Sequence, residues 1–191
     1  MCKKVIGLIS LVLVLVLAGN SPAETFIWDN GGESELWNVP ENWDPNGIPG
    51  SEDTARINIE DANCLIDDSV SAECATVIVA SSKGTSYLNM TGGTLTTTTG
   101  YLSVGHNSNN TGVFTISDGI VTIGGANSNN DLYIGTSGTG TIIMNGGEIN
   151  VYDKVEIGKD ASGNGTLYIY DGTLTLAGNS TDLEIAKYGK K

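Results

Sequence analysis

Apolar and polar side chains alternate with a period of two through most of residues 84–186. Successive side chains of a β-strand point to opposite faces, so this alternation predicts strands with one buried face. The alternating stretches are short, and segments rich in Asn, Ser and Gly, which favour turns, separate them. The pattern predicts an all-β chain of short strands joined by corners.

Four segments of this region align with one another. They are GTSYLNMTGGTLTT from Gly84, NTGVFTISDGIVTI from Asn110, GTGTIIMNGGEINV from Gly138 and GNGTLYIYDGTLTL from Gly163. A glycine at the middle of each segment recurs every 25 to 28 residues, as Gly93, Gly119, Gly147 and Gly172. A third short apolar stretch follows each segment (YLSVG, DLYIG, KVEIG and DLEIA).

Three short strands per coil of 25–28 residues indicate a parallel β-solenoid, or β-helix. An antiparallel sandwich or barrel would not repeat the same residue type once every three strands. In a solenoid, Ile116 and Met144 would lie side by side on consecutive coils. Each coil buries too little apolar surface to fold alone, so we expect the coils to stabilise one another by stacking.

The chain divides into three predicted parts. Residues 1–23 read as a secretory signal peptide, residues 24–54 as a Trp-containing N-terminal cap, and residues 55–191 as the β-solenoid. Within the solenoid, residues 55–80 form an irregular first coil and residues 84–186 the regular repeats. Terminal repeats are expected to be atypical because they cap the core.

The signal peptide prediction rests on Lys3 and Lys4, an apolar run over residues 5–18, and small residues before a cleavage point at Glu24. The run is shorter than the ~20 residues that a membrane span needs. We therefore expect a protein that is secreted or held at the cell surface, with no membrane span once the signal is removed.

The chain has 22 acidic and 9 basic side chains, which gives a formal net charge of −13 at pH 7. Such a chain repels the phosphates of nucleic acids and anionic lipids. Nucleic acid is therefore excluded as a partner, and extracellular polysaccharide or other surface proteins remain.

Cys64 and Cys74 are the cysteines that remain after the signal peptide, and with it Cys2, is removed. In an exported protein such a pair can form a disulfide, which would stabilise the fold by about 3 kcal/mol. The alternative is a pair of buried thiols on adjacent strands. Neither alternative makes them catalytic.

Residues 26–57 have a distinctive opening: a Trp, then two further Trp residues six apart, then a Pro and a short acidic turn. This opening resembles the N-terminal segment of autotransporter-passenger-like bacterial β-helix surface proteins that carry autotransporter-associated β-strand repeats. The matching positions are Trp28, Trp37, Asn42, Trp43, Pro49, Asp53 and Ala55. The glycine-centred repeats resemble the same proteins, and the resemblance implies an exported, extended scaffold without a known activity.

Trp28, Trp37 and Trp43 have two interpretations. Exposed tryptophans can stack on sugar rings, whereas tryptophans at the end of a solenoid close its apolar core. We favour the interpretation that these tryptophans close the end of the apolar core, and keep glycan contact as the alternative.

Catalytic chemistry is poorly supported by the residues present. Glycoside hydrolysis needs two carboxylates that face each other across the bond. Glu156 and Glu184 are predicted to share one outward column, about 5 Å apart, as two solvated charges. His106 is expected to be a solvated side chain in a polar corner, because it has no partner motif. We predict no catalytic, cofactor or metal site.

Calcium is the one cofactor that the composition leaves open. Oxygen-rich corners at residues 129–131, Asp160 and Asp182 could collect it, although no segment matches an EF-hand or a calcium-roll repeat.

The sequence therefore predicts a non-enzymatic, exported scaffold of the cell surface or extracellular matrix with an adhesive role. The alternative is a carbohydrate-binding module, or a remnant of a polysaccharide-active β-helix protein. Lysines at positions 187, 190 and 191 follow the last strand and are expected to discourage edge-to-edge stacking. The alternative prediction is end-to-end contact through the C-terminal coil.

Overall fold

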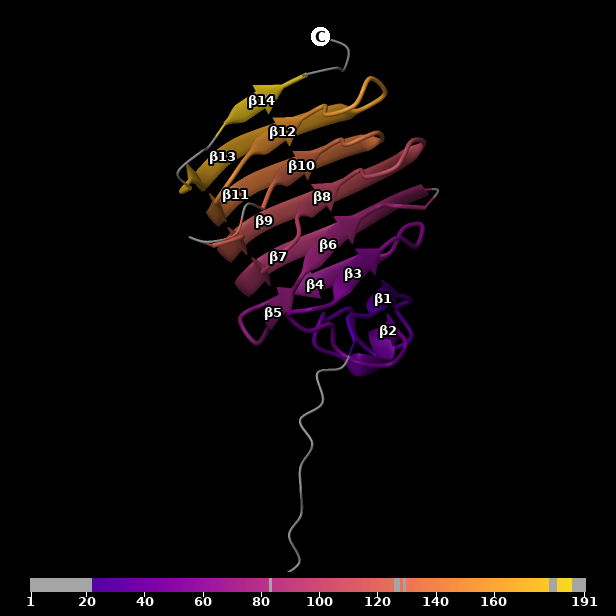
Figure 1. Ribbon diagram of the computed structural model, residues 1–191. Helices are drawn as coiled ribbons and strands as arrows, with labels where there is room; N and C mark the ends of the chain where they lie inside the picture. The colour runs from indigo at the N-terminus through magenta and orange to yellow at the C-terminus, as the bar shows by residue number, and fades with distance from the viewer. Residues whose placement is uncertain (1–21, 83, 126–127, 129, 179–181, 187–191) are drawn as a thin grey trace, which may run out of the picture.

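The computed structural model describes residues 22–82, 84–125, 128, 130–178 and 182–186. The predicted signal peptide lies outside this part except for its last two residues, and the lysines that follow the last strand lie outside it too. The described chain winds into a β-solenoid of about six turns, with parallel sheets stacked along its axis (Figure 1). This confirms the predicted fold class. Among the described residues the only helical segment is the 3-10 turn η1 (Pro40–Asn42).

Sheet A contains the short strands, in the order β14-β12-β10-β8-β6-β3-β1-β2. All neighbours are parallel except β1 and β2. Its strands are β1 (Thr25–Trp28), β2 (Trp43–Asp44), β3 (Thr54–Ile57), β6 (Thr76–Val79), β8 (Leu102–Val104), β10 (Leu132–Ile134), β12 (Val155–Ile157) and β14 (Leu183–Ile185).

Sheet B contains the long strands, in the order β13-β11-β9-β7-β4, and β5 also pairs with β7. Its strands are β4 (Asn63–Ile66), β5 (Ser71–Cys74), β7 (Gly84–Thr97), β9 (Asn110–Ile123), β11 (Thr139–Val151) and β13 (Asn164–Leu176). In each regular coil the predicted first and second strands are two halves of one bent strand of 13 or 14 residues. In the first coil the halves stay separate as β4 and β5.

The bend of the long strands lies at the repeated glycine. The pairing register shifts there between β7 and β9 and between β11 and β13. Gly93 has φ +67°, and a Cβ on it would lie 2.3 Å from the carbonyl oxygens of both Asp67 and Val70. Glycine is therefore required at this point by backbone conformation and by the close approach of the neighbouring coil.

Apolar side chains of sheet B form columns through the coils. Ile116 on β9 pairs with Met90 on β7 and with Met144 on β11, and all three are buried. Leu88, Phe114 and Ile142 form a second such column, and Leu95, Val121 and Ile149 a third. The predicted side-by-side stacking of consecutive coils is confirmed.

The N-terminal segment covers one end of this core. β1 pairs with β3, and a single bridge joins Leu36 to Leu65 in sheet B. Asn42 is fully buried; its amide donates to the carbonyls of Ser34 and Leu36, and its side-chain oxygen accepts from Gly32 N. One side chain thus satisfies three backbone groups of the loop.

Candidate functional site

The outward face of sheet A carries a dense group of chemically active side chains. Strand pairing places Ser103, Tyr133, Glu156 and Glu184 in one column on successive coils. Around this column lie the residues that we call the Tyr–His–Lys cluster: Tyr101, His106, Tyr133, Glu156 and Lys159.

Three rings of this cluster lie against one another. The Tyr101 and His106 rings stack, with centroids 5.8 Å apart and planes 9° apart. The Tyr101 and Tyr133 centroids are 5.3 Å apart, which is close to the spacing of neighbouring strands. Lys159 Nζ lies 3.5 Å from the centroid of the Tyr133 ring, in a cation–π contact. The rings therefore shield one another, and each is only partly exposed.

Ser103 and His106 form the contact that most resembles a nucleophile and its base. Ser103 Oγ lies 3.0 Å from His106 Nδ1 and 2.9 Å from Thr136 Oγ1. However, Ser103 has no exposed surface, so a substrate cannot reach its hydroxyl. The pair acts as a structural hydrogen bond that fixes the imidazole. This differs from the solvated His106 predicted from the sequence.

The prediction of two solvated carboxylates is wrong for Glu156, which is only 6% exposed. Its Oε2 lies 3.5 Å from Lys159 Nζ, and Glu184 Oε1 lies 3.6 Å from Lys154 Nζ. The two glutamates occupy paired positions on neighbouring strands, as predicted, but each has its own lysine. They lie on one face, whereas glycoside hydrolysis needs carboxylates on opposite sides of the scissile bond.

The electrostatic environment keeps two groups of the cluster neutral. Burial lowers the pKa of His106, and the positive charges of Arg56 and Lys159 lower it further, while Asp160 opposes them. Burial raises the pKa of Tyr133, and the hydrogen bond that its hydroxyl donates to Asp131 adds to this rise. Tyr133 is therefore a poor base, since its phenolate is disfavoured.

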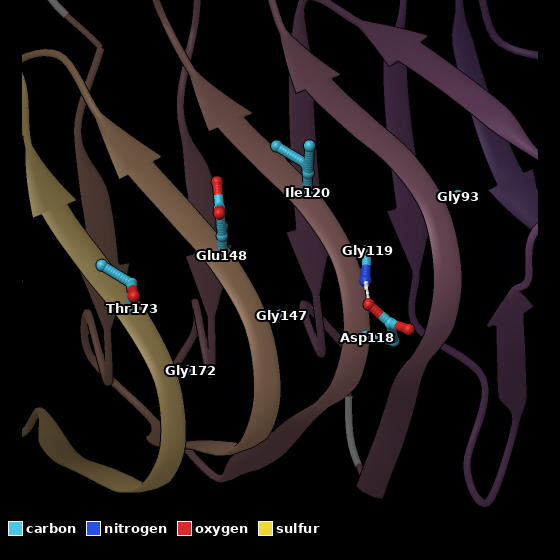
Figure 2. Close-up of a pocket in the computed structure, with 8 residues that line it drawn as sticks. All are labelled: Gly93, Asp118, Gly119, Ile120, Gly147, Glu148, Gly172 and Thr173. Atoms are coloured by element: carbon cyan, nitrogen blue, oxygen red, sulfur yellow. Dashed lines mark hydrogen bonds between the residues drawn. The ribbon is translucent and has the colours of Figure 1, made fainter.

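A second surface lies on the outward face of sheet B, where the long strands bend. A groove of about 540 Å³ crosses β7, β9, β11 and β13 at this point. It is lined by Gly93, Asp118, Gly119, Ile120, Gly147, Glu148, Gly172 and Thr173 (Figure 2). The glycines expose backbone, and the side chains of Asp118, Ile120, Glu148 and Thr173 stand beside them.

Two exposed tyrosines lie near this groove on β13. Tyr168 is 47% exposed and Tyr170 is 73% exposed, and their ring centroids are 6.0 Å apart with planes 11° apart. The sequence reasoning missed this pair, although its signal is the spacing Tyr-x-Tyr within a strand. At a period of two both rings stand on the same outward face.

Trp28, Trp37 and Trp43 have no exposed surface and pack together inside the N-terminal segment. The Trp43 ring contacts the other two edge to face, with centroids 5.0 Å and 4.8 Å away, and its Nε1 donates to the Trp37 carbonyl. Rings in this arrangement have no face to offer to a sugar.

Cys64 and Cys74 are both buried free thiols on β4 and β5. Burial raises the pKa of each thiol; nearby Cys74 and Glu35 raise that of Cys64 further, and Asp53 and Glu73 that of Cys74.

Within the described residues, no group of three or more His, Cys, Asp and Glu side chains is placed to hold a metal ion. Two of the corners predicted to collect calcium use their carboxylates internally: Asp131 accepts from Tyr133 and from Lys154 N, and Asp160 accepts from Ser137. Calcium binding stays a prediction. No helix formed by the described part of the chain could span a lipid bilayer.

Comparison with known proteins gives no match to this chain among protein-family models, curated proteins or solved structures. The structure itself makes the chain a β-helix protein.

Proposed function

We propose that the protein is an exported, non-enzymatic β-solenoid that serves as a scaffold of the cell surface or extracellular matrix and adheres to other surface molecules. The observation that carries this proposal is the regular pairing of the coils, which resumes after the register shift at each bend. From β7 to β13 the same positions pair from coil to coil on both sides of the bend. Such a stack of coils presents an extended, repetitive surface, as a scaffold requires.

The state of the polar groups supports a role without catalysis. In the Tyr–His–Lys cluster the serine hydroxyl is inaccessible, the tyrosine is held protonated, and Glu156 is paired with Lys159. An active site needs an accessible nucleophile or a general base within reach of a substrate. These groups instead bind one another.

The sequence supports the location. Residues 1–23 have the composition of a secretory signal, and the N-terminal tryptophan segment resembles that of autotransporter-passenger-like surface proteins. The net charge of −13 favours solubility and disfavours contact with anionic lipid.

The proposal is tested by expressing the chain in a bacterium with and without residues 1–23. We expect the longer form to be exported, with a mature N-terminus at Glu24, and to be cleaved by protease added to intact cells. An uncleaved chain that stays inside the cells would contradict the exported role.

A separate assay tests the absence of catalysis. Purified protein is incubated with neutral and acidic polysaccharides, with and without calcium, and new reducing ends and unsaturated products are measured. We expect no product above the blank. Turnover that disappears in a Glu156→Gln variant would overturn the non-enzymatic role.

A further inference from the structure

We propose that the outward face of sheet B binds a neutral polysaccharide, which stacks on Tyr168 and Tyr170 and continues along the groove at the bend of the long strands. This inference rests on the proposed adhesive role and names the chemical class of its partner.

The tyrosine pair supplies the stacking surface. Leu167 and Ile169, which alternate with the tyrosines, pair with Ile142 and Met144 in the core columns. Tyr168 and Tyr170 therefore project away from the core, and their rings are nearly parallel. Aromatic rings with a polar tip pack against the apolar C–H faces of sugars while the hydroxyl stays in water. The two rings stack on each other, and because they are 47% and 73% exposed, much of their surface stays open to sugar units.

The groove supplies polar contacts next to the tyrosine pair. Gly172, at its edge, follows Tyr170 by two residues on the same strand, which is about 7 Å of extended chain. Asp118, Glu148 and Thr173 contribute oxygen atoms that can accept hydrogen bonds from sugar hydroxyls. The groove crosses four strands, and neighbouring strands are about 4.8 Å apart, so its shape fits an extended chain.

The distribution of charge selects a neutral ligand. Among the residues that the structure describes, the basic side chains are Arg56, Lys154 and Lys159, and none of them lines the groove. Asp118 and Glu148 do line it. A uronate or sulfate group would therefore meet carboxylates without a compensating cation, in a chain whose net charge is already −13.

The experiment is a pull-down of the purified chain on insoluble cellulose, mannan and chitin. Binding to two soluble anionic polymers, polygalacturonate and dextran sulfate, is measured by affinity electrophoresis. We expect retention on at least one neutral polymer and none by the anionic ones. Raising the salt from about 0.1 M to about 1 M shortens the Debye length from ~10 Å to ~3 Å and should leave the binding unchanged.

Variants locate the site. Tyr168→Ala and Tyr170→Ala should each weaken binding about tenfold, the scale of one aromatic stacking contact, and the double variant should abolish it. The matched control is Tyr152→Ala, which removes a partly exposed tyrosine just after β11. Thermal melts followed by circular dichroism show whether each variant is folded.

Three results would overturn the inference: no binding to any neutral polymer, binding only to the anionic polymers, or a folded double variant that binds like the wild type. Each would leave the scaffold role standing if the protein is exported and folded. Failure of export would contradict the scaffold role without changing the binding measured on the purified chain.

Discussion

Ile116 on β9 and Met144 on β11 occupy the same position of consecutive coils, and neither side chain has exposed surface. Met90 continues the same column on the preceding coil. A residue in this column packs against the coils on both sides. Truncation of its side chain therefore weakens the packing of three strands. The column is the simplest place to measure how much stacking stabilises the solenoid.

Ile116→Ala should lower the free energy of unfolding by about 2–5 kcal/mol, because it removes buried methylene groups and leaves a cavity between two coils. The measurement is urea unfolding followed by circular dichroism. Thr115→Ala is the matched control: Thr115 lies next in sequence but on the outward face, and its change should cost less than about 1 kcal/mol. Equal costs for the two variants would argue against the core columns.

Gly93→Ala should destabilise the fold more than an ordinary Gly→Ala change. The new Cβ would lie 2.3 Å from two carbonyl oxygens of the neighbouring coil, at a backbone φ of +67°. Both the clash and the strain act against the folded state, so we expect a loss of at least about 2 kcal/mol in the same assay.

Gly50→Ala is the control for Gly93→Ala. A Cβ at Gly50 would meet Asp53 Oδ2 at 3.6 Å, an ordinary contact, so this variant should unfold at nearly the wild-type urea concentration. If Gly93→Ala were equally harmless, the bend would not need its glycine.

His106 is the one histidine of the chain, so its titration can be followed directly by NMR. Its pKa is lowered by burial and by Arg56 and Lys159, so the midpoint should fall below the ordinary value of about 6.5. Lys159→Gln should raise the midpoint, whereas Lys154→Gln, which changes the lysine paired with Glu184, should leave it in place.

The same shift has a consequence for stability. The unfolded chain takes up a proton as the pH falls through about 6.5, while folded His106 takes it up only at lower pH. Folding stability from this group is therefore complete above pH ~6.5 and is lost as the pH falls below it. In urea unfolding, His106→Gln should lose less stability than the wild type between about pH 7 and pH 5; an equal loss would contradict the lowered pKa.

Cys64 and Cys74 should resist alkylation in the folded protein, because both are buried and their pKa values are raised. Iodoacetamide at about pH 8.5, the ordinary pKa of a thiol, should label neither of them within the time that labels both in denaturant without reductant. Mass spectrometry of the peptides gives the result. Failure to label in denaturant would mean a disulfide, and labelling of the folded protein would mean that the first coil opens.

The sequence predicted the solenoid because the repeat constrains every coil in the same way. The column through Ile116 and Met144 follows from their equal positions in the repeat, and the pairing of Glu156 with Glu184 follows from the same alignment. The repeat could not show that β7 continues as one strand through the bend at Gly93. A glycine is expected both at a tight corner between two strands and at a bend within one strand.

The environment of the polar residues was harder to predict. Glu156 is paired with Lys159, which lies in the turn that follows β12, and the alternation of strand residues carries no information about side chains in turns. His106 likewise stacks on Tyr101, which lies on the other side of a short strand. The tyrosine pair on β13 was visible in the sequence, but only the structure shows that its rings are parallel and exposed.

The two-residue strand β2 has a consequence for self-association. It forms the last member of sheet A beside β1, runs antiparallel to it, and is followed at once by Pro45, which has no N–H to donate. A strand from another molecule would find few free backbone N–H and C=O groups at this edge to hydrogen-bond with. The β2 edge of sheet A therefore disfavours the addition of a further strand, and with it fibre growth at this edge.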